Sequence, residues 1–552
     1  MRMQRLAFLC GIGAVGVMVP APATGQVADL VLMGGQIWTG ADDHMATAVA
    51  VSGGRVLAVG SDEEIERLAG PATEHIVLDG RRVLPGFMDA HTHFIDGGFE
   101  LASVELRDAA SPEEFARRIG EFAAAHSGAW VTGGTWDHEL WGGELPRKEW
   151  IDSLTRDTPV FVSRLDGHMG LANSVALARA GITAATPDPP GGTIVRADNG
   201  DPTGVLKDAA QSLVSRVIPA RSRAEVDRAL EAAVAHAVAH GVTMITDMGS
   251  WAGHEAYMRA AERRALPIRV YSVVPIALRA RLAAEVERVG RGDHRLFWGG
   301  VKAFVDGSLG STTAWFYEPY VDEPSTTGLT VSDTSELREA MREADAAGLQ
   351  LIVHAIGDRA NDWLLEAFAD VRASNGPRDR RPRIEHAQHL TRQAIQRIAD
   401  DGVIASMQPY HAIDDGRWAE KRIGQARLET TYAFRDLEEA RARVAFGSDW
   451  TVAPLDPLRG IYAAVTRRTI DGANPDGWVP RQRVSVADAV RSYTSHSAYA
   501  AYLEGELGTL EPGKHADLVV LSDDIFAIDP VKIEHVKVDL TMVSGEVVYE
   551  RK

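Results

Sequence analysis

Residues 83–93, with the sequence VLPGFMDAHTH, join a buried-type apolar run to two histidines, His91 and His93. The apolar run predicts a β-strand that ends at the histidines. Side chains two positions apart on a strand point to the same face, so both imidazoles are expected on one side of the sheet. Two imidazoles that converge at a strand end are suited to holding a metal ion. Taken alone, a His-x-His pair is a weak indication of such a site.

Seven further segments predict buried strands, and glycine-terminated helices precede several of them. Ser222 and Glu225 form a capping box for a helix that runs to His240, and Gly241 separates it from the next strand. Alternation of helix, glycine and buried strand is typical of parallel βα units. Eight such strands predict a closed (β/α)8 barrel, with an open doubly wound sheet as the alternative. The seven strand segments are 242–247, 268–274, 301–306, 349–354, 383–386, 403–407 and 444–449.

The two ends of the chain have a different pattern. Short apolar runs turn at Gly53-Gly54 near the start and at Ser544-Gly545 near the end, as tight hairpins do. About 150 residues separate His93 from Thr243, whereas one βα unit needs only about 30. The excess predicts an insertion at the barrel mouth. We therefore expect a composite β-sandwich domain from 26–84 and 505–552, a barrel from 85–93 and 212–504, and an insertion over 94–211.

The first 25 residues have the order of a secretory signal. Arg2 and Arg5 precede an apolar run over 6–19, and small residues follow it. A run of about 14 residues is shorter than the roughly 20 that span a bilayer, although a retained membrane helix is the alternative. We expect cleavage of 1–25 and export to the periplasm or the medium. Cys10, the one cysteine, would be lost with this segment.

Composition excludes several classes of protein. Of 552 residues, 45% are hydrophobic and 24% are charged, which rules out a disordered, collagenous or coiled-coil chain. The net charge of −19 is unfavourable for binding to nucleic acid or to an anionic membrane surface. A small molecule is then the expected partner, and association into a homo-oligomer stays open.

Three more predicted strands end in metal-ligand types, namely His354, His386 and Asp449. Any one of these could be a core polar residue with its own hydrogen-bond partner. A charged or imidazole side chain is rarely buried at a strand end unless it is paired or bound to metal. Four strands ending in this way predict a metal centre.

Lys302 lies inside the apolar strand VKAFV, over 301–305. A buried ammonium group is costly and either shifts its pKa or finds a partner. One interpretation is an ion pair with Asp306, four residues further on. The other is a neutral amine that reacts with carbon dioxide to form a carbamate, an anionic ligand able to bridge two cations.

Several phrases of the sequence resemble the amidohydrolase superfamily, and in particular its third family. The closest branch is the group of YtcJ-like metal-dependent amidohydrolases, related to N-substituted formamide deformylase. The resemblance extends into the insertion, through Trp136-Asp137 and residues 166–168. One departure is Thr451, where relatives often have proline. The phrases that carry it are PGFMDAHTH (85–93), VKAFVDGSLGS (301–311), HAIGDRA (354–360), GSDW (447–450) and LEPGKHADL (510–518).

The resemblance implies a mechanism for cleaving an amide C–N bond. One divalent metal ion would be held by His91, His93 and Asp449, and a second by His354 and His386, with carbamylated Lys302 bridging them. A shared hydroxide would be the nucleophile, and Asp449 would act as general base and then protonate the leaving nitrogen. Zinc suits the nitrogen-rich ligands, and iron, manganese and nickel are alternatives.

Other reactions run on similar barrels. A single-metal aminohydrolase that deaminates a heterocycle is the main alternative, and a lyase or isomerase is a further one. Such deaminases typically carry a glutamate shortly after the fifth-strand histidine and need no fourth-strand lysine. This chain has Asp358 and Lys302 there, which favours amide hydrolysis.

Residues near the substrate are predicted from their places in the insertion or just after barrel strands. Asp306 is expected to position Lys302 or a ligand histidine. The candidates for lining the substrate pocket are Trp136, His168, Trp315, Tyr410 and Trp450.

Overall fold

The computed structural model describes residues 26–41, 45–126 and 128–552, so the predicted signal segment lies outside the described residues. Its centre is an eight-stranded parallel sheet in the order β20-β19-β18-β17-β16-β15-β14-β8. The strands follow one another along the chain in the order in which they lie side by side. They are β8 (Phe87–Thr92), β14 (Val242–Met248), β15 (Arg269–Pro275), β16 (Leu296–Phe304), β17 (Gln350–Ala355), β18 (Arg383–His386), β19 (Ile404–Met407) and β20 (Arg443–Phe446).

The sheet returns on itself at its carboxyl-terminal end. Thr92, at the end of β8, forms a parallel bridge with Trp450, just beyond β20. The backbone N–H of His93 donates to Trp450 O at 2.6 Å, and that of Asp449 donates to His91 O at 2.7 Å. The predicted (β/α)8 barrel is therefore confirmed, and the open doubly wound sheet is wrong.

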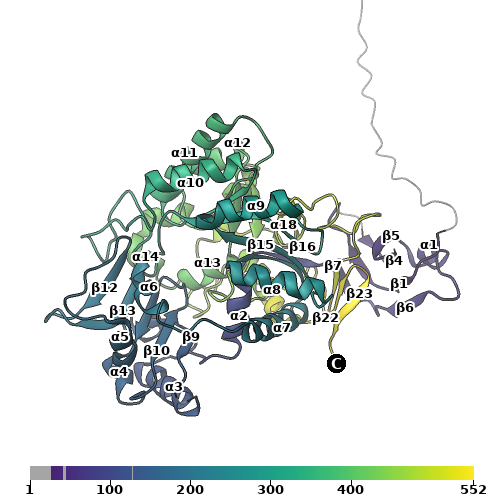
Figure 1. Ribbon diagram of the computed structural model, residues 1–552. Helices are drawn as coiled ribbons and strands as arrows, with labels where there is room; N and C mark the ends of the chain where they lie inside the picture. The colour runs from purple at the N-terminus through teal and green to yellow at the C-terminus, as the bar shows by residue number, and fades with distance from the viewer. Residues whose placement is uncertain (1–25, 42–44, 127) are drawn as a thin grey trace, which may run out of the picture.

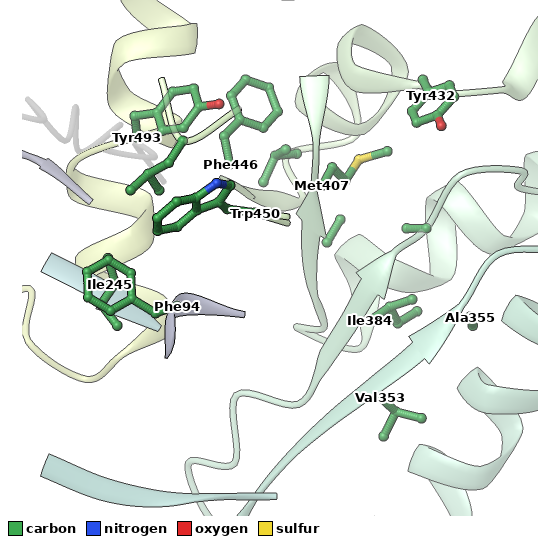
Figure 2. Close-up of a cluster of buried hydrophobic side chains, with 14 of the residues drawn as sticks. Phe94, Ile245, Val353, Ala355, Ile384, Met407, Tyr432, Phe446, Trp450 and Tyr493 are labelled. Carbon is green, nitrogen blue, oxygen red and sulfur yellow. The ribbon is translucent and has the colours of Figure 1, made fainter. Parts of the chain in front are cut away.

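Helices cover the outside of the barrel (Figure 1). The predicted capping box of Ser222 and Glu225 starts the first of them, α7. Apolar side chains such as Ile245, Val353, Ile384 and Phe446 fill the layer between strands and helices (Figure 2). The covering helices include α7 (Arg223–Ala239), α8 (Trp251–Glu262), α9 (Arg279–Val289), α10 (Thr334–Ala346), α11 (Asp358–Asn375), α12 (Arg392–Asp400) and α15 (Phe434–Glu439).

The segment expected as one strand over 83–93 is divided at Gly86. A Cβ atom there would lie 2.3 Å from the side chain of Thr243, so this close approach requires glycine. The residues before it form β7 (Arg82–Pro85), which pairs antiparallel with β21 (Leu518–Leu521) rather than with the barrel. Both chain ends thus contribute to one sheet.

That sheet has the order β23-β22-β21-β7-β2-β3, and a second sheet has the order β5-β4-β1-β6. Apolar side chains from both sheets form one buried cluster, which makes this part a sandwich. The Gly53-Gly54 and Ser544-Gly545 turns have positive φ at all four residues, as expected for tight hairpins. The remaining strands are β1 (Leu30–Met33), β2 (Gln36–Trp38), β3 (Met45–Ala46), β4 (Ala48–Ser52), β5 (Arg55–Gly60), β6 (Glu74–Val77), β22 (Val538–Val543) and β23 (Glu546–Glu550).

A five-stranded sheet with its own apolar core follows the first barrel strand in sequence. It lies on the far side of the barrel from the sandwich (Figure 1). The short helix α2 (Phe94–Glu100) packs on α7 instead, with Gly98 against the backbone of Ala229. No helix among the described residues is long and apolar enough to cross a bilayer. The strands of the insertion are β9 (Val131–Trp136), β10 (Val160–Arg164), β11 (Met169–Ala172), β12 (Gly192–Arg196) and β13 (Pro202–Asp208).

Candidate metal centre

The six side chains predicted as metal ligands meet at the carboxyl-terminal end of the barrel. Asp449 Oδ1 lies 3.3 Å from His91 Nε2 and 3.3 Å from His93 Nε2. Lys302 points into the barrel, with its Nζ 3.3 Å from His91 Nε2. The ring of His386 lies 4.9 Å from that of His91 and 4.6 Å from that of His354. The strand ends therefore bring together the groups that the sequence analysis had assigned to one centre.

Each of three imidazoles has one ring nitrogen next to an oxygen. His91 Nδ1 is 2.5 Å from Glu385 Oε2, and His386 Nδ1 is 2.8 Å from Gln408 Oε1. His354 Nε2 is 3.0 Å from the carbonyl oxygen of Gly307. Because these oxygens accept hydrogen bonds, each imidazole donates through that nitrogen and keeps a lone pair on the other. This is the tautomer that a metal-binding histidine needs.

The ionisation states of most of these groups also suit metal ligands, whereas Asp449 raises the pKa of His93 against the effect of burial. Burial, together with the nearby Lys302, lowers the pKa of His91 to about 4. Burial likewise lowers the pKa of His354 and of His386 well below the usual value. Although burial opposes it, the imidazole of His91 and its neighbours hold the pKa of Asp449 well below its usual range. Neutral imidazoles beside an ionised carboxylate are the forms that bind metal ions.

Within the described residues, Lys302 does not form the ion pair with Asp306 that the sequence left open. Asp306 accepts hydrogen bonds from the backbone N–H groups of Trp315, Ile356 and Gly357 at 2.7–3.0 Å. Its Oδ1 lies 3.6 Å from His354 Nε2, so Asp306 supports a ligand histidine. Burial lowers the pKa of Lys302 from 10.5 to about 8, which brings the neutral amine closer to neutral pH.

The arrangement fits a bound cation. Asp449 Oδ1 is buried and has no hydrogen-bond partner among the described residues. Ligand atoms of His91, His386 and Asp449 lie within 4.8 Å of one another. A set of nitrogen and oxygen donors without thiolates is the set that zinc and its first-row neighbours accept.

Comparison with known proteins gives the family. The model of the family described as "Amidohydrolase family" matches residues 74–549. The chain belongs to this family. As an amidohydrolase, it is an enzyme acting on carbon–nitrogen bonds other than peptide bonds, and its family is metal-dependent.

Three related proteins align with most of this amidohydrolase chain. It is 41% identical to "Protein LONG AFTER FAR-RED 3" of Arabidopsis thaliana, over 91% of this chain and 88% of the relative. It is 34% identical to "Putative amidohydrolase YtcJ" of Bacillus subtilis (strain 168), over 94% and 99%. It is 29% identical to "N-substituted formamide deformylase" of Arthrobacter pascens, over 95% and 99%. The resemblance inferred from the sequence is therefore confirmed.

A solved structure has a similar fold. An uncharacterized metal-dependent hydrolase from Pyrococcus horikoshii is 29% identical to this amidohydrolase, with a TM-score of 0.74. The similarity covers 91% of this chain and 99% of the other.

The five residues expected to line the substrate pocket lie in different parts of the structure. His168 lies at the centre: its ring is 5.2 Å from that of His354, and its Nδ1 is 2.7 Å from Asp208 Oδ1. Trp136 is wrong as a pocket residue, because it is fully buried in the core of the insertion. Its Nε1–H donates to Val162 O at 2.9 Å, which leaves no polar group for a substrate.

Trp450 is also wrong as a pocket residue. Its ring packs between Phe94 and His236, at centroid distances of 5.9 and 5.0 Å, within the barrel's apolar layer (Figure 2). The indole of Trp315 lies 4.4 Å from the guanidinium of Arg359 and outside the two cavities that reach the metal centre. Tyr410 is absent from the walls of both cavities, whereas its neighbour His411 lines one of them.

Several residues of the site were not predicted from the sequence. Glu385 and Gln408 orient ligand histidines, and Arg383 Nε donates to Glu385 Oε1 at 2.8 Å. His411 Nε2 lies 4.0 Å from Asp449 Oδ2. A usable indication was present in Arg383-x-Glu385, since two charged residues on one face of a buried strand must be paired.

Proposed function

We propose that this amidohydrolase cleaves the amide C–N bond of a small molecule with two divalent metal ions at the described centre. His91, His93 and Asp449 would hold one ion, and His354 and His386 the other. Carbamylated Lys302 would be a ligand to both. The observation that carries the proposal is the position of Lys302, with its amine inside the barrel and 3.3 Å from His91 Nε2. Beside two divalent ions, a cationic amine there would be strongly repelled.

Formation of the carbamate follows from the chemistry of the amine. The neutral Nζ attacks the carbon of carbon dioxide and forms an N–C bond, and one proton leaves Nζ for solvent. The product is an anionic oxygen ligand in place of a cation. The pKa of Lys302, which burial lowers to about 8, supports this reaction.

The residues of the chain have distinct roles in hydrolysis. When bound, divalent ions acidify water and polarise a carbonyl oxygen. Asp449 takes up the proton of the attacking water and delivers it to the leaving nitrogen, while its Oδ1, which faces His91 and His93, would be the metal ligand. Glu385, Gln408 and Asp306 keep the imidazoles in their ligand orientation. Zinc is the first choice of metal, with iron, manganese and nickel next.

Deamination of a heterocycle by a single-metal centre is the second candidate. It is disfavoured by Asp358, which stands where deaminases have a glutamate. Asp358 Oδ1 accepts the N–H of Tyr317 at 3.0 Å, and the residue lines neither cavity at the centre. A lysine among the ligands also has no role in that reaction.

The experiment is a screen of metal-free enzyme reconstituted with zinc and bicarbonate. The substrates are N-formyl, N-acetyl and N-acyl-amino-acid amides, with cyclic amides, esters and amino-substituted heterocycles alongside. We expect amine release from amides by enzyme that carries two ions. Ammonia release from heterocycles by enzyme carrying one ion would replace this proposal with the second candidate. Asp449→Asn is the inactive control.

A further inference from the structure

Two cavities meet at the metal centre, and both are lined by His354, His386 and Asp449. The smaller, called here the polar chamber, has a cavity volume of about 50 Å³. The larger, called the aromatic groove, has a cavity volume of about 1080 Å³. A substrate whose scissile bond lies at the centre can therefore extend into both. The polar chamber is defined by Gln388, His411 and Trp418, and the aromatic groove by Phe99, Phe122, Trp130 and Phe161, while Arg164 lines both.

The wall of the polar chamber holds buried polar atoms that form no hydrogen bond within the described residues. Trp418 Nε1, Arg164 Nη2, Gln388 Oε1 and His411 Nε2 make no hydrogen bond among the described residues. All four side chains belong to residues that are more than nine-tenths buried. Buried polar groups in folded proteins are nearly always hydrogen-bonded, so four around one cavity indicate a missing ligand.

The two arginines at the chamber are already paired with carboxylates. Arg164 Nη1 lies 2.7 Å from Asp166 Oδ2, and its Nη2 lies 3.5 Å from Asp137 Oδ1. Arg417 in turn contacts Asp137 at 2.7 Å and also pairs with Asp414. Because both arginines already contact carboxylates, no unpaired arginine is left at this position to bind an anionic ligand.

We infer that the polar chamber binds a neutral carboxamide group of the substrate, while the aromatic groove binds an aromatic group on the other side of the scissile amide bond. The N–H groups of Trp418 and Arg164 suit a carboxamide oxygen, and Gln388 Oε1 suits its N–H. The inference rests on the proposed function only for the position of the scissile bond.

The aromatic groove supports the other half of the inference. Its four aromatic side chains come from α2, from α3 (Pro112–Ala125), from the loop before β9 and from β10. Phe304, which follows Lys302 by two residues, continues the lining to the metal centre. Aromatic side chains favour an aromatic ring as ligand, and charged side chains such as Glu100 and Arg221 also line the groove.

Binding is tested with ketones in which CH₂ replaces the amide N–H, so that no cleavage can occur. Three of these ketones carry a benzyl group on the CH₂ side. Their acyl side ends in a carboxamide in the first, a carboxylate in the second and an isopropyl group in the third. Three more reverse the direction of the linkage. In one of the two series, we expect the carboxamide compound to bind metal-loaded enzyme at least about tenfold more tightly than the carboxylate and isopropyl compounds. A tenfold difference in affinity is the size of one well-made hydrogen bond.

Trp418→Phe removes the indole N–H and should abolish most of this preference, whereas Trp363→Phe, on the outer helix α11, should leave it unchanged. Phe161→Ala should weaken binding of the benzyl compounds but not of their methyl analogues. Equal affinities for the three ends, or a preference that survives Trp418→Phe, would overturn the inference.

Hydrolysis of the matching amides is measured in parallel. Binding preference without any hydrolysis would contradict the proposed function alone, and hydrolysis without preference would contradict the inference alone.

Discussion

His91 Nδ1 lies 2.5 Å from Glu385 Oε2, so a carboxylate on β18 fixes the imidazole at the end of β8. Although burial opposes it, Arg383 and His91 hold the pKa of Glu385 at about 2. The carboxylate stays ionised and keeps the proton of His91 on Nδ1. The Nε2 lone pair therefore faces Asp449 and Lys302, where a metal ion would bind.

Replacing Glu385 tests this relationship. Glu385→Gln keeps the shape but removes the charge, and we expect metal affinity to fall by about 10- to 100-fold, as for other partners of ligand histidines. It also leaves Arg383 buried without its ion pair, which should reduce the free energy of unfolding by about 3 kcal/mol. Metal titration and chemical denaturation measure the two effects. Glu366→Gln, exposed on α11, is the control; affinity unchanged in Glu385→Gln would show that Glu385 does not orient His91.

Removal of the lysine amine tests the bridging carbamate. Lys302→Ala should lose most of its metal and nearly all turnover, and short carboxylic acids should restore part of both, because they replace the missing anionic ligand. Asp449→Asn should abolish turnover without rescue, because no added acid reproduces a positioned proton acceptor. Metal analysis and amide hydrolysis with and without acetate or propionate check both expectations. A Lys302→Ala enzyme with full metal and full activity would exclude the carbamate.

Asp415 makes stability depend on pH. Burial raises the pKa of this half-buried carboxyl from 3.8 to about 7, with nearby Asp414 adding to the rise. The stabilisation that the protonated Asp415 adds to the free energy of unfolding is therefore fully present below pH 3.8 and is lost as pH rises through 7. Relative to Asp415→Asn, the wild-type protein should lose about 2 kcal/mol of unfolding free energy between pH 5 and pH 8. Denaturation curves at the two pH values measure it, with exposed Asp157→Asn as control. A constant difference between wild type and Asp415→Asn would contradict the assignment.

Export is a prediction that depends on the sequence alone. Expression in a bacterial host should place the protein in the periplasm, with cleavage near Gly25-Gln26, because residues 1–25 have the order of a secretory signal. Intact-mass measurement of the periplasmic fraction would detect the loss of this segment. A full-length mass in that fraction would contradict cleavage.

The sequence predicted the barrel and its ligand-type strand ends because parallel strands present their carboxyl ends at one rim. Sequence periodicity gives no distance between separate layers, however. Trp136 ends a strand of the insertion and Trp450 directly follows Asp449, yet both side chains lie in apolar cores. Glu385 was missed for the opposite reason: its role depends on a contact with His91, 294 residues away. Gly86 divides the first strand where the pairing changes from β21 to β14, and these distant partners are not revealed by any local pattern.

The central claim is tested most directly by counting metal ions in enzyme reconstituted with and without bicarbonate, while amide hydrolysis is followed in the same samples. The account predicts close to two ions per chain in fully active enzyme. It also predicts that without carbon dioxide, metal content and activity fall together. Full activity with one ion per chain, independent of carbon dioxide, would contradict it.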